Sequence, residues 1–285
     1  MEKEAFMARI FKTAGTAVLA LVLIVILVIV IGYRKSMRVN EVTVDDHLLV
    51  LEGGGGNSII LTSEDGSRAL VVDTKMGSAA KDLAARVTAK SVVVVNTHLH
   101  RDHTGGNRLF PDATVISGSY SRDQWRKLCG KTRFPDILLQ PGQDTAITIG
   151  SETVHLRNMG AAHSWQDVVV YLEKRKFLMT GDLVFNHLHP ALFVQGGSNV
   201  ASWIDVLDTL IDRYQPSRVL PGHGVLSDQN ALREMKRYFV TIRNALGDPQ
   251  KLAAARNAFR EYHGIPMLTG FDKVVSFMEK EGTGK

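Results

Sequence analysis

Four side chains that can coordinate a metal ion crowd into six positions of the chain: His98, His100, Asp102 and His103. They follow residues 92–95, an apolar run of four valines that predicts a strand buried on both faces. In an extended or loop conformation, side chains two positions apart point the same way, so His98 and His100 can meet one ion. Asp102 and His103 would face a second ion close by. Imidazole and carboxylate ligands suit zinc, with iron or manganese as second choices.

A single histidine in a loop is more often a solvated side chain than a metal ligand. Three histidines and an aspartate directly behind a buried strand differ from that case. Without a metal, they would gather several titratable groups at the strand end with no gain in packing. The cluster therefore predicts a metal site.

Composition argues against thiolate metal sites and nucleic-acid binding. Cys129 is the only cysteine, which excludes a disulfide within the chain and a zinc site built from thiolates. The formal net charge is +5, but the basic residues are scattered and no run of five occurs. Nucleic-acid binding is therefore not indicated. We expect a small-molecule substrate, and the sequence leaves the oligomeric state open.

Residues 14–32 carry no charged side chain. As a helix they would span roughly 28 Å, about the thickness of a hydrocarbon core. A cleaved signal peptide is the alternative, but residues 32–36 offer no small-residue cleavage site. We predict one N-terminal transmembrane helix that anchors the protein in the membrane. Three basic residues lie on each side of the span, so the positive-inside rule does not set the orientation. We expect a periplasmic or extracytoplasmic domain, because such anchors more often export the domain behind them.

About 245 residues follow the anchor, enough for one large α/β domain. Strands and helices should position the ligands. Predicted strands are residues 41–44, 47–52, 58–62, 69–72, 92–95, 114–116, 146–149, 153–157, 168–172, 176–179 and 218–220. Predicted helices are residues 81–87, 108–109, 121–128, 202–214, 232–259 (as one or two helices) and 271–278. This order suggests two sheets packed face to face with helices on the outer faces. The four glycines at 53–56 fit a hairpin connection or a flexible loop beside the site.

Three further candidates, His163, Asp182 and His223, are each predicted in a loop just after a strand and stand next to glycine or alanine. Such a position is rigidly held and still open to substrate. Asp73 closes the predicted strand 69–72.

The motifs His98-x-His100-x-Asp102-His103, His163, Gly181-Asp182 and Pro221-Gly222-His223-Gly224 resemble those of the metallo-β-lactamase superfamily in order and spacing, and Asp73 matches its first motif. The resemblance implies an α/β fold, a four-layer αββα sandwich, here preceded by the transmembrane helix. It divides the chain into an anchor with its flanks (1–38), a metallo-β-lactamase-like domain (39–230) and a helical extension packed on that domain (231–285).

The same resemblance implies a ligand set and two zinc ions per chain, with iron or manganese possible. His98, His100 and His163 would bind the first metal; Asp102, His103 and His223 the second; and Asp182 would bridge both. Asp73 would orient the ligand loop through hydrogen bonds. Asp102 would also orient the nucleophile and so be catalytic.

Two positions differ from the residues usual in some branches of the family, and they indicate which branch this chain resembles. Many zinc β-lactamases have cysteine or serine at the bridging position, whereas glyoxalase II-like hydrolases have aspartate, so Asp182 argues against a dedicated β-lactamase. Ala162-His163-Ser164 replaces the Gly-His-Thr usual in glyoxalase II and the persulfide dioxygenases. With Asp167 following, this loop is more similar to the SoxH-type branch of exported metallohydrolases.

The resemblance therefore implies a membrane-anchored dinuclear zinc hydrolase whose metal-bridging hydroxide cleaves an ester, thioester or lactone-type carbonyl. The alternatives are a single-iron persulfide dioxygenase, a zinc hydrolase with β-lactamase side activity, and a non-catalytic accessory protein. His187 and His189 could line the substrate cleft or protonate the leaving group, or be ordinary loop residues. Trp125, Trp165, Tyr238 and Phe239 are predicted core residues, as is the apolar face of helix 202–214.

Overall fold

The computed structural model describes residues 21–27, 30–32, 34–35, 37–264 and 268–282. The chain forms two units, Met1–Arg38 and Val39–Lys285. In the first unit the described residues 21–27 and 30–32 are helical, and their apolar side chains are exposed. Much of the predicted membrane span, residues 14–20 and 28–29, lies outside the described residues. Within the described part, no helix combines the length and apolar character needed to cross a membrane.

The first sheet of the second unit has seven strands in chain order, and it carries the His98 cluster behind its fifth strand. The strands are β1 (Val39–Asp45), β2 (Leu48–Gly53), β3 (Ser58–Thr62), β4 (Arg68–Val72), β5 (Ser91–Val95), β6 (Thr114–Gly118) and β7 (Ile137–Leu139). Strands β1 to β4 pair antiparallel, and β4 to β7 pair parallel. The parallel half places the carboxyl ends of β4 and β5 side by side, which brings Asp73 next to the ligand loop.

The second sheet has five strands in the order β12-β11-β10-β9-β8. Their bounds are β8 (Asp144–Ile149), β9 (Glu152–Asn158), β10 (Val168–Leu172), β11 (Phe177–Phe185) and β12 (Arg218–His223). Strands β10 and β11 form an antiparallel hairpin, and β12 joins β11 in parallel. One apolar cluster contains residues of both sheets, among them Leu70 and Val95 from the first and Val170 and Met179 from the second. The two sheets therefore pack face to face.

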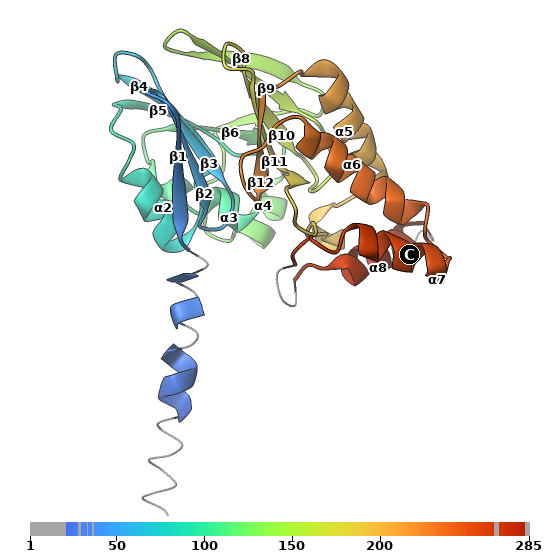
Figure 1. Ribbon diagram of the computed structural model, residues 1–285. Helices are drawn as coiled ribbons and strands as arrows, with labels where there is room; N and C mark the ends of the chain where they lie inside the picture. The colour runs from blue at the N-terminus through green and yellow to red at the C-terminus, as the bar shows by residue number, and fades with distance from the viewer. Residues whose placement is uncertain (1–20, 28–29, 33, 36, 265–267, 283–285) are drawn as a thin grey trace, which may run out of the picture. The chain divides into compact units, whose positions relative to one another are not determined.

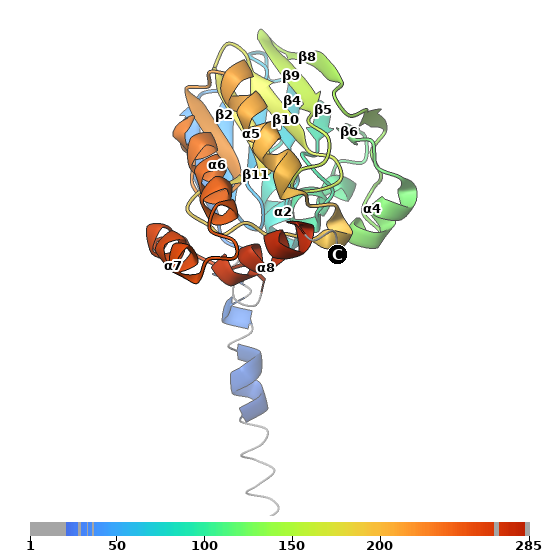
Figure 2. The same cartoon turned by 90° about the vertical axis from the view of Figure 1, so that its right-hand side faces the viewer.

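Helices cover the outer faces of both sheets (Figures 1 and 2). The covering helices are α2 (Gly77–Ala84) on the first sheet and α5 (Val200–Arg213) and α6 (Asn230–Arg243) on the second. The other helices are α3 (Arg101–Thr104), α4 (Arg122–Cys129), α7 (Pro249–Ala258) and α8 (Phe271–Gly282), with short 3-10 turns η1 (Asn107–Leu109) and η2 (Val194–Gly196). Leu83 of α2 packs on the first sheet, and Trp203 of α5 and Phe239 of α6 belong to the cluster on the second. The predicted αββα layers are confirmed.

The sequence-based boundaries need two local corrections. The ligand loop was expected to be extended or irregular throughout, but Asp102 and His103 lie in the helical turn α3. Strand β7 was not predicted; it is only three residues long and pairs at the edge of the parallel half. The predicted helical segment 232–259 is two helices, since α6 ends at Arg243 and α7 begins at Pro249, where Asp248 caps its first turn.

Candidate metal centre

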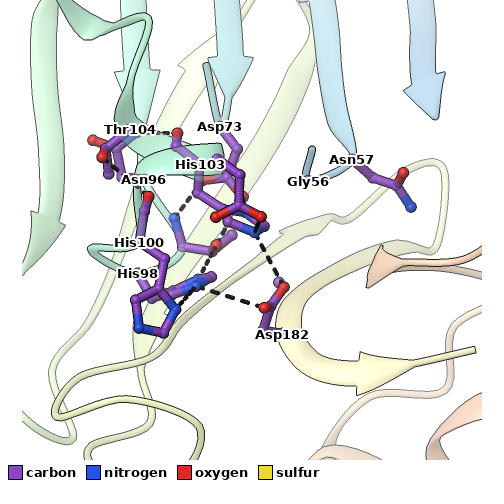
Figure 3. A network of polar contacts seen from close by, with 12 residues as sticks. Gly56, Asn57, Asp73, Asn96, His98, His100, His103, Thr104 and Asp182 are labelled. Carbon is purple, nitrogen blue, oxygen red and sulfur yellow. Dashed lines mark hydrogen bonds and ion pairs between the residues drawn. The ribbon is translucent and has the colours of Figure 1, made fainter. Parts of the chain in front are cut away.

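Asp73 fixes the orientation of the ligand loop. Its buried carboxylate accepts hydrogen bonds from the backbone N–H of Thr97 (2.8 Å) and from the Thr97 hydroxyl (2.7 Å). Asp73 Oδ2, which accepts the hydrogen bond from the Thr97 hydroxyl, also lies 2.7 Å from Nδ1 of His103 (Figure 3). With Nδ1 held by the carboxylate, the other ring nitrogen of His103, Nε2, faces the centre of the site. Asp73 has a φ of +58°, a strained conformation for a residue other than glycine.

The first ligand group consists of three imidazole rings. His98 Nε2 lies 2.9 Å from His100 Nδ1, and His163 Nε2 lies 3.0 Å from the same atom. The Thr97 hydroxyl lies 3.1 Å from Nδ1 of His98, on the side of the ring away from His100, and orients that ring. His163 comes from the loop after β9, and the Ser198 hydroxyl donates a hydrogen bond to its carbonyl oxygen (2.6 Å).

The second group consists of Asp102, His103 and His223. Asp102 Oδ2 lies 3.3 Å from His223 Nε2 and 3.6 Å from His103 Nε2. Helix α3 presents Asp102 and His103, while His223 is the last residue of β12 in the other sheet. The group therefore spans both sheets.

Asp182 contacts residues of both groups, and Figure 3 shows it facing His98 and His103. Its Oδ1 is 3.2 Å from His103 Nε2, and its Oδ2 is 3.3 Å from His163 Nε2 and 3.4 Å from His223 Nε2. The prediction that Asp182 and His223 lie in loops after strands was wrong, because β11 continues to Phe185 and contains Asp182, and β12 continues to His223. The pairing of β11 with β12 is irregular between Gly181 and Phe185.

All seven predicted ligand residues thus come together from distant parts of the chain. Their donor atoms form two compact sets, each with all atoms within 4.8 Å of one another. The first set is His98, His100, His163 and Asp182, and the second is Asp102, His103 and His223. The remaining six residues divide between the sets as the family resemblance implies, while Asp182, expected to bridge, belongs to the first set.

The polar atoms of these residues fit a bound cation. Among the described residues, buried Nε2 of His103 and buried Oδ1 of Asp182 have no hydrogen-bond partner. In the first group, Nε2 of His98 and Nε2 of His163 each lie about 3 Å from Nδ1 of His100, which suits lone pairs that converge on one positive charge. Nitrogen and carboxylate donors without thiolate are a usual set for catalytic zinc.

Burial prepares the first group for coordination. It lowers the pKa of His98 and His100 and lowers that of His163 to about 3, so these rings are neutral at pH 7. Burial opposes the ionised forms of Asp102 and Asp182, but the surrounding histidines outweigh it and lower the pKa of both carboxyl groups. Neutral imidazoles and ionised carboxylates are the forms that bind metal.

In the protein without metal, His103 and His223 behave differently. Burial opposes their charged forms, but the carboxylates of Asp182 and Asp102 outweigh it. They raise the pKa of His103 well above its usual range and that of His223 to about 9. A metal ion at this group would replace those protons.

Comparison with known proteins places the chain in a family. The model of the metallo-beta-lactamase superfamily matches residues 51–238, more than half of the sequence. The chain belongs to the metallo-beta-lactamase superfamily. This confirms the family predicted from the motifs, and the prediction of a hydrolase agrees with the relatives found within the superfamily.

One curated relative is the acyl-coenzyme A thioesterase MBLAC2 of Gallus gallus, 26% identical over 162 residues. That match covers 47% of this chain and 57% of the relative, so the chain spans little more than half of that protein's length. Similar solved structures include a metallo-beta-lactamase from Pontibacter korlensis (TM-score 0.62, 21% identity, 71% of this chain and 99% of that one). Another is the DIM-1 metallo-beta-lactamase (TM-score 0.61, 21% identity, 72% and 98%). At this identity the structures show a shared fold.

The glycine turn 53–56 is a hairpin connection, as one of the two interpretations predicted, and it lies beside the site. It connects β2 to β3 as a hairpin, and it also lies against the metal ligands. A Cβ atom on Gly55 would lie 2.8 Å from Cβ of Asp102, and one on Gly56 would lie 2.3 Å from Cε1 of His103. Only bare backbone fits so close to these side chains.

Lys75, which the sequence did not single out, holds this turn in place. Its side chain is fully buried, and its Nζ donates hydrogen bonds to three carbonyl oxygens: Leu51 (2.9 Å), Gly53 (2.6 Å) and Gly56 (2.7 Å). Burial lowers the pKa of Lys75 to about 7, against the opposing pull of the nearby carboxylates. The position of Lys75 two residues after Asp73 was the only signal in the sequence.

Other supporting residues were also missed. The side chains of Thr74 and Asn96 donate to the carbonyl oxygen of His103 (3.3 and 3.1 Å), and Asn107 accepts hydrogen bonds from both. Through these hydrogen bonds, Thr74, Asn96 and Asn107 fix the position of the α3 backbone at His103. Each is a polar residue at the end of a parallel strand or in the turn behind the ligands, which is the signal that could have found them.

His187 and His189, proposed as possible cleft residues, belong to neither ligand group among the described residues. Nδ1 of His189 lies 2.7 Å from the Tyr238 hydroxyl, and the His187 ring packs near Tyr262. Both therefore support the C-terminal helices. Tyr238, Phe239 and Trp125 are buried as predicted, while Trp165 is only half-buried.

Proposed function

We propose that this protein is a dinuclear zinc hydrolase that cleaves thioesters, with esters and lactones as related substrates. The observation that carries the proposal is the placement of Asp182: its Oδ1 faces His103 of the second group, and its Oδ2 lies near His163 of the first group and His223 of the second. A carboxylate in that position can bridge two ions. Because both groups are complete, two ions suit the site better than the single iron of a persulfide dioxygenase.

Residues His98, His100 and His163 would hold the first ion, and Asp102, His103 and His223 the second. Such ions, when bound, polarise a carbonyl group and lower the pKa of water from about 15.7 to near 7. The protein groups then position the reactants. Asp102 is the more exposed of the two carboxylates that line the site, with 26% of its side chain accessible, so it can accept a hydrogen bond from the attacking water.

The choice of a thioester rests on the acyl-coenzyme A thioesterase among the relatives. The fold neighbours are β-lactamases, but the aspartate at the bridging position favours the other hydrolases of the superfamily. We treat β-lactam cleavage as a side activity.

We also propose that residues 14–32 anchor the protein in a membrane and that the enzymatic unit lies outside the cytoplasm. The support for the anchor is an uncharged stretch of about the thickness of a bilayer core. The side of the membrane rests only on the tendency of N-terminal anchors to export the domain that follows.

The test uses full-length protein purified in detergent and loaded with zinc. We expect elemental analysis to find about two zinc ions per chain. We also expect the protein to hydrolyse acyl thioesters, which is measured by the release of the free thiol. Asp182→Asn should lose bound metal and turnover together. Full activity in a variant without metal would refute the proposal, and one iron per chain with oxygen uptake would favour the dioxygenase.

A further inference from the structure

An open cavity of about 490 Å³ is lined by the segment that follows β11 and by helix α8. Apolar side chains form most of its wall: Leu192, Phe193, Val194, Leu268, Val274 and Phe277. Its size falls in the range of small-molecule sites, roughly 300–1,000 Å³. Val194 is 73% exposed and Leu268 is 46% exposed, so this wall leaves large apolar side chains in contact with water.

One residue of the cavity wall, Phe193, contacts the first ligand group. The Phe193 ring packs edge-on against the His100 ring, with 5.1 Å between the ring centres. A molecule whose carbonyl carbon lies at the metal centre can therefore extend past Phe193 into the cavity.

The opposite wall is firmly held. Helix α8 inserts Phe271, Val274 and Met278 into the core on the second sheet. Near its end, the Glu281 carboxylate accepts a hydrogen bond (2.8 Å) from the backbone N–H of Val200, in the first turn of α5. A wall tied to the core in this way presents a preformed surface to a ligand.

We propose that this cavity binds the acyl chain of the thioester substrate and thereby selects substrates by chain length. The inference rests on the proposed thioesterase function. An acyl chain is the occupant that fits, because most of the lining side chains are apolar and one of them, Phe193, contacts the ligand residue His100. The polar lining residues are Asp272, Lys273, Ser276 and Lys280 of helix α8. Burying one methylene is worth a factor of about three to four in binding, so the preference should rise with chain length until the cavity is filled.

Two positions on α8 give a matched test. Ser276 lines the cavity and is exposed, so Ser276→Trp should fill the space without disturbing the core. Glu279 is exposed on the same helix and does not line the cavity, so Glu279→Trp is the control. The assay measures kcat/KM of the zinc-loaded full chain for thioesters with acyl chains from two to twelve carbons.

We expect kcat/KM of the wild type and of Glu279→Trp to rise steeply with chain length. Ser276→Trp should keep the acetyl rate and lose at least tenfold at eight carbons or more. If Ser276→Trp keeps the wild-type dependence on chain length, the inference is wrong and the thioesterase proposal stands.

Absence of hydrolysis for every thioester, by protein with two zinc ions per chain, would instead refute the proposed function. A fluorescent fatty acid then decides about the cavity alone. Binding to the wild type and to Glu279→Trp, but not to Ser276→Trp, would retain it as a site for an apolar chain, and equal binding or no binding would overturn it.

Discussion

Replacement of Lys75 by methionine tests whether a buried ammonium group holds the glycine turn against the metal site. Lys75→Met keeps the length of the side chain but removes three hydrogen bonds to the carbonyl oxygens of Leu51, Gly53 and Gly56. Each buried carbonyl left without a donor costs about 1–3 kcal/mol. The variant also avoids the cost of burying the ammonium group, which offsets part of that loss.

We therefore expect Lys75→Met to lower the free energy of unfolding by about 3 kcal/mol. In a unit of this size, that corresponds to a fall in Tm of about 6–12 °C. A second effect separates a positioning role from a purely structural one. Because the turn lies against Asp102 and His103, its displacement should weaken the second metal site by about 10–100-fold, as loss of other supporting contacts does.

The assay titrates zinc-loaded protein with a chelator and follows the two zinc ions separately, alongside thermal unfolding. Lys81→Met is the matched control, since Lys81 is exposed on α2; it should keep both sites and the wild-type Tm. If Lys75→Met retains both zinc ions with wild-type affinity, the turn does not depend on Lys75 to support the second site.

Three further predictions concern the same region. Burial raises the pKa of Asp167 from 3.8 to about 7, so its contribution to stability is complete below pH 3.8 and disappears as the pH rises through 7. Between pH 4 and pH 8, the free energy of unfolding of the metal-free wild type should therefore fall relative to that of Asp167→Asn, by roughly 4 kcal/mol at most. The same dependence of the free energy of unfolding on pH in both proteins would contradict this. Addition of zinc to metal-free protein at pH 7.5 should release protons from His103 and His223, detectable with a pH indicator, and zinc uptake without proton release would rule out their protonation. Gly56→Ala should lose the second zinc ion, because its methyl group would overlap His103; two tightly bound ions in this variant would show that the turn can move away.

The sequence predicted the ligands better than the backbone that carries them. The His98–His103 cluster was recognisable because its members are neighbours along the chain, and His163, Asp182 and His223 were recognisable only through family motifs. The position of Asp182 inside β11 depends on the irregular pairing with β12. Residue types within β11 do not specify such a long-range register.

Supporting residues were harder to predict because their partners are backbone groups or distant side chains. Lys75 acts on carbonyl groups about twenty residues earlier, and a buried lysine has no distinctive local pattern. Phe193 gains its place beside His100 from the fold of the segment after β11. His187 and His189 lie near Asp182 in sequence, yet the chain turns after Phe185 and carries them to the C-terminal helices.

The location of Asp182 within a strand has a consequence for how the enzyme can diversify. The backbone of β12 closes tightly over this carboxylate, since even a Cβ atom on Gly222 would lie 1.9 Å from Asp182 Oδ1. The neighbouring strand therefore fixes the position of Asp182, the carboxylate that would bridge two ions under the proposed function. Loops that contact substrate can exchange, lengthen or shorten over evolutionary time while the reactive core keeps its dimensions.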